Sequence, residues 1–561
     1  MGFIYGVDSD KKREELLNSS KAKRFIDEVI AKADTAISEI SPAFKMSEYM
    51  LFEETGNRTI FEKGYFERRN KCFSILIAFW LTKDEKYIKP LVDYITYISD
   101  EFTWCLPAHA HRSNNTVEGI IEEVDLFQSE TARLFSEIVA IVGDKLPDYT
   151  KERMKYEIER RIFAGFKKGR SFEWETWPMN WVTVCGAGVF AAALYFGNDE
   201  DKEFFYNRCE PYLSTYLLGI EDDGCCQEGL SYWGYGFSHF VILAELIKEY
   251  SKGKVDYFKQ DKVKELALFP QRVRLSKSKV ASISDGGEEF SFKMGLLCYL
   301  KNLYPEVTLP SLEFGTYYGN VYSVSEFLWF FEDYKEDEIK KGLSWLKDTE
   351  WYINRKDNYS FVAKGGYNDE PHNHNDIGSF IVEVGDELIL TDLGCGEYVK
   401  ETFQPETRYT FPQNSSRGHS VPIINGEYQL YGKEYKAKNV KATENGFSLD
   451  IESAYRSGLI EKLARSFTLE DNKVILKDSF ILSDETKSFT ERLVSRVKPE
   501  ILDGYVDFGK VKVYFDKEKI SVSVNTETYI SHKGNIELTF FETDFELKDI
   551  ADGEAVLEIV I

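Results

Sequence analysis

Residues 371–398 read PHNHNDIGSFIVEVGDELILTDLGCGEY, and this stretch contains the change of secondary structure that decides the fold. The apolar run over residues 380–384 predicts a strand, and a glycine-containing turn separates it from a second strand that ends at Asp392. From about residue 350 onward, apolar residues recur at every second position. That period is typical of strands with one buried face, so the sequence predicts antiparallel β-structure for its C-terminal part.

Residues 511–524 show this alternation over two successive runs. Apolar and more polar residues alternate over residues 511–515, and they alternate again over residues 520–524 after the polar turn 516–519. Two alternating runs joined by a short polar segment are typical of a β-hairpin. We therefore expect these two strands to pair with each other.

The N-terminal part of the chain follows a different period. Between about residue 20 and about residue 345 the apolar positions follow a helical spacing, for example at Leu91, Ile95 and Ile98. A run of helices followed by a run of strands indicates separate α and β domains. The chain of 561 residues is also longer than a domain with a single hydrophobic core usually is. We therefore predict two domains, residues 1–345 and residues 346–561.

The composition limits the classes of partner. The formal net charge of −25 argues against nucleic acid and against a long polyanion, because most of the surface would repel either one. The 34 Tyr, 41 Phe and 9 Trp suit a surface that stacks on sugar rings, although core packing uses aromatic residues as well. A short acidic oligosaccharide in a locally basic pocket is compatible with this charge.

The start of the chain and its cysteines indicate a compartment. Residues 1–17 contain neither the basic region nor the apolar region of a secretion signal, and no apolar run approaches the length of a membrane span. The eight cysteines match no zinc or disulfide spacing, which favours free thiols in a reducing environment. The sequence therefore predicts a cytoplasmic protein that does not bind membranes, and it leaves a homo-oligomer open.

A group of histidines and carboxylates surrounds the first predicted C-terminal strands. We expect His372, His374 and Asp376 to lie on one face of an extended segment. His374, Asp392 and the more distant His419 together offer two nitrogen ligands and one oxygen ligand. Such a set suits Zn²⁺ with one position left for water or a further ligand.

Two other interpretations of this group remain open at the level of sequence. The histidines and carboxylates can be satisfied polar residues at the edge of a sheet. They can also hold a catalytic zinc that activates water in a hydrolase, with Glu370 or Asp376 as the nearby general base. Spacing alone does not distinguish a structural zinc from a catalytic one.

The helical half contains three further groups of polar and aromatic residues. Asn180 lies between two tryptophans in WPMNWVTVC (177–185), and residues 223–236 read DGCCQEGLSYWGYG. Residues 108–133 contain AHAHR and, further on, VDLFQSETAR. A packed helix junction explains such clusters as well as a catalytic centre does, and the residues by themselves leave both open.

Taken together, these motifs resemble the heparinase II/III-like polysaccharide lyases over nearly the whole length of the chain. The resemblance rests on HNHNDIGSF with the following TDLG, on NSSRGHS around His419, and on NWVTVC and DGCCQEGLSYWGYG in the helical half. It implies an incomplete (α/α) toroid at residues 1–345 and an antiparallel β-sandwich at residues 346–561. The implied activity is that of a carbon–oxygen lyase, which cleaves uronic-acid-containing glycans by β-elimination. The acidic charge favours exolytic action on short fragments, and endolytic action stays open.

The resemblance also assigns roles to individual residues. Asn180 corresponds to the amide that neutralises the uronate carboxylate, and Tyr235, 55 residues later, corresponds to the tyrosine that acts as base and acid. His372 and Tyr409 match the further catalytic histidine and tyrosine of the family. Zinc in such lyases is structural and supports the loops that carry these two residues. Many relatives have a histidine directly after the amide, whereas this chain has Trp181, which leaves open whether both uronate epimers are processed.

The predicted substrate contacts come from both halves of the chain. They are expected to bind an acidic oligosaccharide through carboxylate or sulfate groups and through sugar rings, and Tyr232 is also the local competitor for the role of Tyr235. The predicted residues are Arg112, Glu228, Tyr232, Trp233, Arg408 and Arg417. A zinc-dependent glycan hydrolase and a non-catalytic carbohydrate-binding protein remain the alternatives to a lyase.

Overall fold

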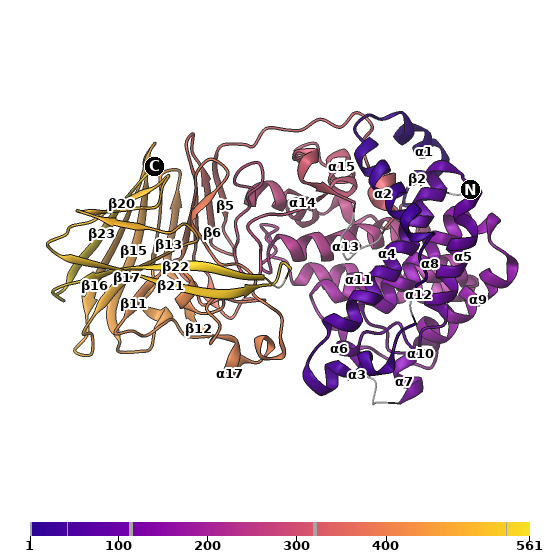
Figure 1. Cartoon of the computed structure of the whole chain (residues 1–561), viewed down its shortest axis with the longest axis horizontal. Helices are drawn as coiled ribbons and strands as arrows, with labels where there is room; N and C mark the ends of the chain where they lie inside the picture. The colour runs from indigo at the N-terminus through magenta and orange to yellow at the C-terminus, as the bar shows by residue number, and fades with distance from the viewer. Residues whose placement is uncertain (1–2, 42, 111–115, 318–322, 535) are drawn as a thin grey trace. The chain divides into compact units, whose positions relative to one another are not determined.

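The computed structural model describes residues 3–41, 43–110, 116–317, 323–534 and 536–561. The chain forms two compact units, a helical unit and a sheet unit (Figure 1). The helical unit consists of Met1–Ile220, Tyr232–Lys264 and Ser291–Asp337, and the sheet unit of Glu221–Ser231, Glu265–Phe290 and Glu338–Ile561. The predicted division had a single boundary after residue 345. In the structure, two segments from the helical half of the sequence belong to the sheet unit.

The N-terminal two-thirds of the chain is dominated by helices, as its apolar period predicts. The predicted face of α5 is confirmed, because Leu91, Ile95 and Ile98 are all buried. The main helices are α1 (Ser9–Asn18), α2 (Lys23–Ala36), α3 (Met46–Thr55), α4 (Thr59–Thr82), α5 (Ile88–Ser99), α8 (Leu126–Val142), α9 (Asp148–Ile158), α11 (Asn180–Phe196), α12 (Asp199–Leu218), α13 (Leu230–Tyr250), α14 (Asp261–Val273) and α15 (Met294–Leu303).

Two glycines let α11 pack closely in the middle of the helical unit. A Cβ at Gly188 would lie 2.1 Å from the backbone oxygen of Ser129 in α8. A Cβ at Gly186 would lie 2.9 Å from the ring of Tyr212 in α12. Any larger residue at either position would therefore force the helices apart. Gly186 and Gly188 lie within the three residues after the NWVTVC motif, so this stretch of α11 serves helix packing.

The sheet unit is built from antiparallel sheets. A five-stranded sheet has the order β10-β9-β7-β6-β5, a four-stranded sheet the order β11-β17-β22-β21, and an eight-stranded sheet the order β13-β14-β15-β16-β23-β20-β19-β18. Their strands are β5 (Gly342–Leu346), β6 (Trp351–Arg355), β7 (Ser360–Lys364), β9 (Phe380–Glu383), β10 (Leu388–Leu390), β11 (Pro422–Ile424), β13 (Lys438–Thr443), β14 (Gly446–Asp450), β15 (Ile460–Leu469), β16 (Lys473–Leu482), β17 (Phe489–Ser495), β18 (Glu500–Leu502), β19 (Tyr505–Asp507), β20 (Lys512–Tyr514), β21 (Ile520–Ser531), β22 (Ile536–Leu547) and β23 (Gly553–Val560).

A shared apolar core joins these sheets into a sandwich. Phe361 and Phe380 of the five-stranded sheet pack against Phe467 of the eight-stranded sheet, with ring centroids 5.1 and 5.2 Å apart. Phe489 and Phe545 add the four-stranded sheet to the same buried cluster. The predicted fold class, helices followed by an antiparallel β-sandwich, is confirmed.

The predicted hairpin over residues 511–524 is wrong, although both of its strands exist. β20 pairs with β19 and β23, whereas β21 pairs with β22 in a different sheet. The polar turn between them therefore carries the chain from one sheet of the sandwich to the other. Alternation reports that a strand has one buried face, but the partner strand is chosen by contacts far away in the sequence.

Two further expectations from composition can be compared with the described residues. The eight cysteines are all free thiols, as their spacing predicts. Among the residues that the structure describes, no helix is long and apolar enough to cross a membrane.

Candidate functional site

The predicted residues Asn180 and Tyr235 lie at the starts of two helices that touch. Asn180 is the first residue of α11, and the hydroxyl of Thr183 donates to the backbone oxygens of Asn180 and Gly236, both at 3.1 Å. A Cβ at Gly236 would lie 3.0 Å from the Cβ of Asn180, so the glycine lets α13 approach α11 at this point. The neighbouring Tyr235 is thereby held near Asn180, which is itself buried.

Tyr235 has a carboxylate partner that the sequence analysis did not assign. Its hydroxyl donates to Oε1 of Glu130 in α8 at 2.7 Å. Burial and the neighbouring Glu130 hold the pKa of Tyr235 well above its ordinary value, so the phenol is protonated at neutral pH. The ring packs edge-on against His239, with centroids 5.2 Å apart. The VDLFQSETAR motif contains Glu130, but nothing in its spacing relates this residue to Tyr235.

Aromatic residues surround the start of α11. Trp177 and Trp181 are half-buried and lie with ring centroids 5.6 Å apart. His109 approaches Trp181 at 4.8 Å, and its Nδ1 is hydrogen-bonded to Asp125 at 2.7 Å. By contrast, the predicted contact residue Trp233 is 1% exposed, which favours a packing role.

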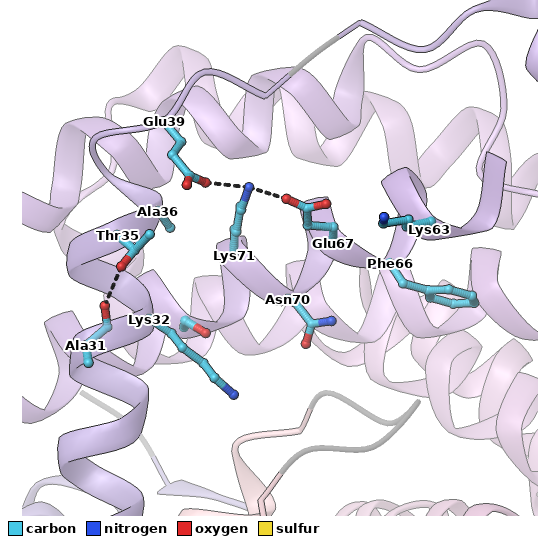
Figure 2. Close-up of a pocket in the computed structure, with 11 residues that line it drawn as sticks. Ala31, Lys32, Thr35, Ala36, Glu39, Lys63, Phe66, Glu67, Asn70 and Lys71 are labelled. Atoms are coloured by element: carbon cyan, nitrogen blue, oxygen red, sulfur yellow. Dashed lines mark hydrogen bonds and ion pairs between the residues drawn. The ribbon is translucent and has the colours of Figure 1, made fainter. Parts of the chain in front are cut away.

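A cavity of about 780 Å³ lies elsewhere in the helical unit, between α2 and α4 (Figure 2). Lys71 stands in its wall between two carboxylates and pairs with Glu39 at 2.6 Å and with Glu67. Neither Asn180 nor Tyr235 lines this cavity. It is therefore distinct from the predicted catalytic residues of this unit.

In the sheet unit, Asp285 connects the predicted histidines. Its carboxylate lies 2.5 Å from Nδ1 of His372, 3.1 Å from Nε2 of His374 and 2.8 Å from the hydroxyl of Tyr398. Burial raises the pKa of Asp285, but the bonds from the two histidines outweigh it and hold the pKa well below its ordinary value. Asp285 is therefore an ionised acceptor that orients both rings.

The segment around His372 is not extended, which corrects one expectation. Residues 371–372 form a turn, and His372 has a left-handed backbone with φ of 56°. Such a conformation costs a non-glycine residue on the order of 1 to 3 kcal/mol and recurs at functional sites. The two histidines reach the same carboxylate because of this turn, whereas an extended segment was expected to align them on one face.

Three other predicted residues lie near His372. Oε1 of Glu228 is 3.3 Å from Nε2 of His372, because the segment Glu221–Ser231 folds into the sheet unit. Arg408 donates to the backbone oxygen of Asn373 and lies 3.8 Å from Asp285. Tyr409 is half-buried and stacks on Tyr431, with centroids 4.8 Å apart.

The remaining predicted arginines are placed differently. Arg417 forms ion pairs with Glu527 at 2.5 Å and with Glu542 at 3.2 Å, so a substrate anion would have to compete with two carboxylates. Arg112 lies outside the described residues.

The three predicted zinc ligands lie together with a fourth residue. His374, Asp376, Asp392 and His419 are all buried, and one potential ligand atom from each lies within 4.8 Å of the others. Nδ1 of His374 is buried with no hydrogen-bond partner, while Nε2 of the same ring is held by Asp285. A histidine that metal binds through one nitrogen usually donates the other to a carboxylate. The donor set and the unpartnered nitrogen therefore fit a zinc ion.

We expect the purified protein to contain a stoichiometric amount of zinc. His374→Ala should lower the zinc content strongly, because it removes one of the three proposed protein ligands. His532→Ala is the matched control and should leave the zinc content unchanged, since this exposed histidine is not part of the cluster. Elemental analysis after dialysis measures both. Wild-type protein that contains no zinc and takes none up would contradict the assignment.

The chain combines a helical unit with an antiparallel β-sandwich unit that holds a cluster of histidines and carboxylates, and this combination defines its class of protein. Residues 338–556 match the family model described as Heparinase II/III-like, C-terminal. The chain therefore carries a heparinase II/III-like C-terminal domain, and the predicted resemblance is confirmed for this domain and for the fold.

Solved structures with the same fold cover nearly the whole chain. A heparan sulfate lyase HepC mutant from Pedobacter heparinus is 13% identical, with a TM-score of 0.61 over 98% of this chain and 92% of its own. A heparinase III is 13% identical, with a TM-score of 0.65 over 95% and 84%. A chondroitin AC lyase from Streptomyces coelicolor A3 is 9% identical, with a TM-score of 0.53 over 98% and 82%. No curated protein sequence matches the chain.

Proposed function

We propose that this chain is a polysaccharide lyase that cleaves uronic-acid-containing glycans by β-elimination and acts exolytically on short fragments. The relatives named as lyases of heparan sulfate and chondroitin support an acidic glycan as substrate. The observation that carries the proposal is that Asn180 and a protonated Tyr235 lie on two helices, α11 and α13, that are in contact at Gly236, the residue next to Tyr235.

β-Elimination places two demands on the protein. The proton at C5 of a uronate is weakly acidic while the neighbouring carboxylate is ionised, so the enzyme must first neutralise that charge. A base must then remove the C5 proton, the electron pair forms the C4=C5 bond, and the C4–O4 bond breaks as O4 takes up a proton. The first demand can be met by a neutral hydrogen-bond donor placed before the reaction begins, whereas the second needs groups that take up and release protons.

In the helical unit, Asn180 and Tyr235 suit these two tasks. The Asn180 amide donates to the substrate carboxylate and stabilises the negative charge that builds up on it in the transition state. Tyr235 exchanges protons with C5 and then with O4. Because the phenol is protonated at neutral pH, Tyr235 carries the proton that the leaving oxygen takes up.

In the sheet unit, we assign supporting roles to the residues around Asp285. His372 assists proton transfer, and Asp285 holds its ring through Nδ1. Tyr409 and Arg408 bind the sugar chain, and Arg408 is anchored by the backbone oxygen of Asn373. A zinc ion at His374, Asp392 and His419 would stabilise the loops that carry these residues, without taking part in the reaction.

The structure disfavours the hydrolase alternative. A zinc hydrolase needs a free carboxylate as general base near the metal, and the two candidates were Glu370 and Asp376. Both are bound by the buried Lys364, whose Nζ lies 3.1 Å from Glu370 and 2.6 Å from Asp376. To act as a general base, either carboxylate would first have to leave its ion pair with the buried ammonium group.

The test is to incubate the protein with a panel of sulfated and unsulfated uronate oligosaccharides. Elimination creates a conjugated C4=C5 double bond, so ultraviolet absorbance should rise as the chain is cleaved. Mass spectrometry should find products whose masses add up to that of the substrate. Products that contain one added water would show a hydrolase instead, and binding without cleavage would show a carbohydrate-binding protein.

We expect short oligosaccharides to be cleaved faster than long polymers of the same glycan. The net charge of −25 should repel an extended polyanion more than a short fragment, and a cytoplasmic enzyme would meet only imported fragments. The difference should shrink as salt rises, because the Debye length falls to about 10 Å at 0.1 M. Rates on a size-graded series at low and high ionic strength measure this. Faster cleavage of polymer to products of random size would contradict both the exolytic mode and the cytoplasmic location.

A further inference from the structure

We propose that Glu130 is a positioning residue that acts through Tyr235. Its carboxylate holds the phenolic proton of Tyr235 by a hydrogen bond and receives it while Tyr235 takes the proton from C5. This inference rests on the proposed function, and it adds a second proton site within the helical unit. In this relay Tyr235 exchanges protons with the substrate, and Glu130 exchanges protons with Tyr235.

The geometry places Glu130 as the acceptor for Tyr235. Oε1 of Glu130 lies 2.7 Å from the hydroxyl of Tyr235, and the Glu130 side chain is buried on α8, at 7% exposure. Arg133, one helical turn further along α8, directs its ion pair to Glu137 at 2.7 Å. Glu130 is thus a buried carboxylate whose described hydrogen bond goes to the proposed catalytic tyrosine.

Several charged or titratable groups lie around Glu130 and influence its charge. Nε2 of His239 lies 3.9 Å from Oε1, but burial lowers the pKa of His239 well below its ordinary value, so this ring is neutral. Burial also lowers the pKa of Lys293. The groups that act on Glu130 or line the same small cavity are Asp125 at the N-cap of α8, Arg133 of α8, Tyr235 and His239 of α13, Lys293 before α15, and Arg69 of α4.

Together, these influences raise the pKa of Glu130 above its ordinary value. Burial raises the pKa of Glu130 more than Arg133, Tyr235 and Lys293 lower it, and the net result is a pKa of about 7. A carboxylate with such a pKa can accept a proton near neutral pH and also release it again. General bases and acids work best when their pKa lies near the operating pH.

The proposed relay conserves protons. In the first step the C5 proton moves to the oxygen of Tyr235, and the phenolic proton moves to Oε1 of Glu130. In the second step the electron pair at C5 forms the C4=C5 bond, the C4–O4 bond breaks, and Tyr235 gives a proton to O4. Glu130 then returns its proton to Tyr235, so both residues end as they began.

The test is the pH dependence of kcat/KM for Glu130→Gln. In the wild type, activity should rise with pH through about 7 as Glu130 loses its proton, and then level off. The amide oxygen of Gln can still accept the bond from Tyr235, but it cannot take the proton. We therefore expect the plateau to fall by about 10²-fold or more and the rise through neutral pH to vanish. Glu249→Gln, on the same helix as Tyr235 but three to four turns away, is the matched control and should keep the wild-type profile.

Two further measurements separate this role from a structural one. Glu130→Asp keeps a carboxylate, so it should retain part of the activity and a rise with pH, whereas a structural role predicts equal damage from Asp and Gln. Because the folded state raises the pKa of Glu130, ionising it destabilises the fold as pH rises through about 7. Glu130→Gln should therefore melt at a higher temperature than the wild type at alkaline pH, and this difference should disappear at acidic pH.

The outcomes distinguish the relay from the function on which it rests. If wild-type protein forms unsaturated product and Glu130→Gln keeps its rate and its pH profile, the relay is wrong and the lyase stands. If Glu130→Gln loses activity together with its melting transition, and Glu130→Asp is equally inactive, Glu130 is structural. If the wild type forms no unsaturated product from any uronate glycan, the lyase proposal falls, and the relay falls with it.

Discussion

Tyr235→Phe is expected to lower kcat by about 10³-fold or more while the protein keeps its fold. The substitution removes only the hydroxyl that exchanges protons with C5 and O4. The ring, which packs against His239 with centroids 5.2 Å apart, remains in place. Initial rates of absorbance increase on a uronate oligosaccharide measure the loss, and circular dichroism with a melting curve checks the fold.

Tyr232→Phe is the matched control for this prediction. Tyr232 lies in the same motif, and its hydroxyl is the alternative candidate for acid and base. The hydrogen bond between Tyr235 and Glu130 favours Tyr235, so Tyr232→Phe should reduce kcat only slightly. If Tyr232→Phe lowers kcat more than Tyr235→Phe does, Tyr232 is the acid and base, and the Glu130 relay loses its basis.

The second large effect is expected for Asn180→Ala, which should lower kcat on the order of 100-fold or more with a smaller change in KM. The amide is proposed to stabilise charge that develops only in the transition state, and interactions of this kind act on kcat. The Cβ of Asn180, which lies close to Gly236, is kept in the variant, so the contact between α11 and α13 should persist. Steady-state kinetics over a range of substrate concentrations separate kcat from KM.

Asn198→Ala provides a control of a different kind for Asn180. The side chain of Asn198 caps α12 by accepting a hydrogen bond from the backbone N–H of Asp201 at 2.9 Å. Its loss should reduce the free energy of unfolding by about 1 kcal/mol and leave kcat unchanged. An unchanged kcat in Asn180→Ala as well would show that Asn180 serves only packing.

Much of the fold could be predicted from local patterns. The helical face of α5 and the strand β9 follow from the spacing of apolar residues, because the period of side chains along a helix or a strand is a local property. The pairing of β20 and β21 could not be predicted in this way. Which strands become neighbours depends on core contacts between residues that are far apart in the chain.

Some residues of the candidate site could likewise be found in the sequence, and others are recognised only in the structure. The sequence motifs contain His374, Asp392 and His419, and the structure brings them together with Asp376. Asp285 lies in an inconspicuous SDGG segment about 90 residues before the histidines, and it is the fold that makes it their common acceptor. Glu130 likewise meets Tyr235 across 105 positions of the chain.

The sequence by itself determined the helical and sheet halves, the resemblance to a family, and the types of side chain available for catalysis and for metal binding. Only the tertiary structure decided that segments of the helical half belong to the sheet unit, that His372 lies in a left-handed turn, and that Tyr235 donates to a buried carboxylate. The physical reason is the distance along the chain over which each interaction acts. Periodicity and turn chemistry act over a few residues, whereas burial, and the shifts in pKa that follow from it, depend on every element that packs around a group.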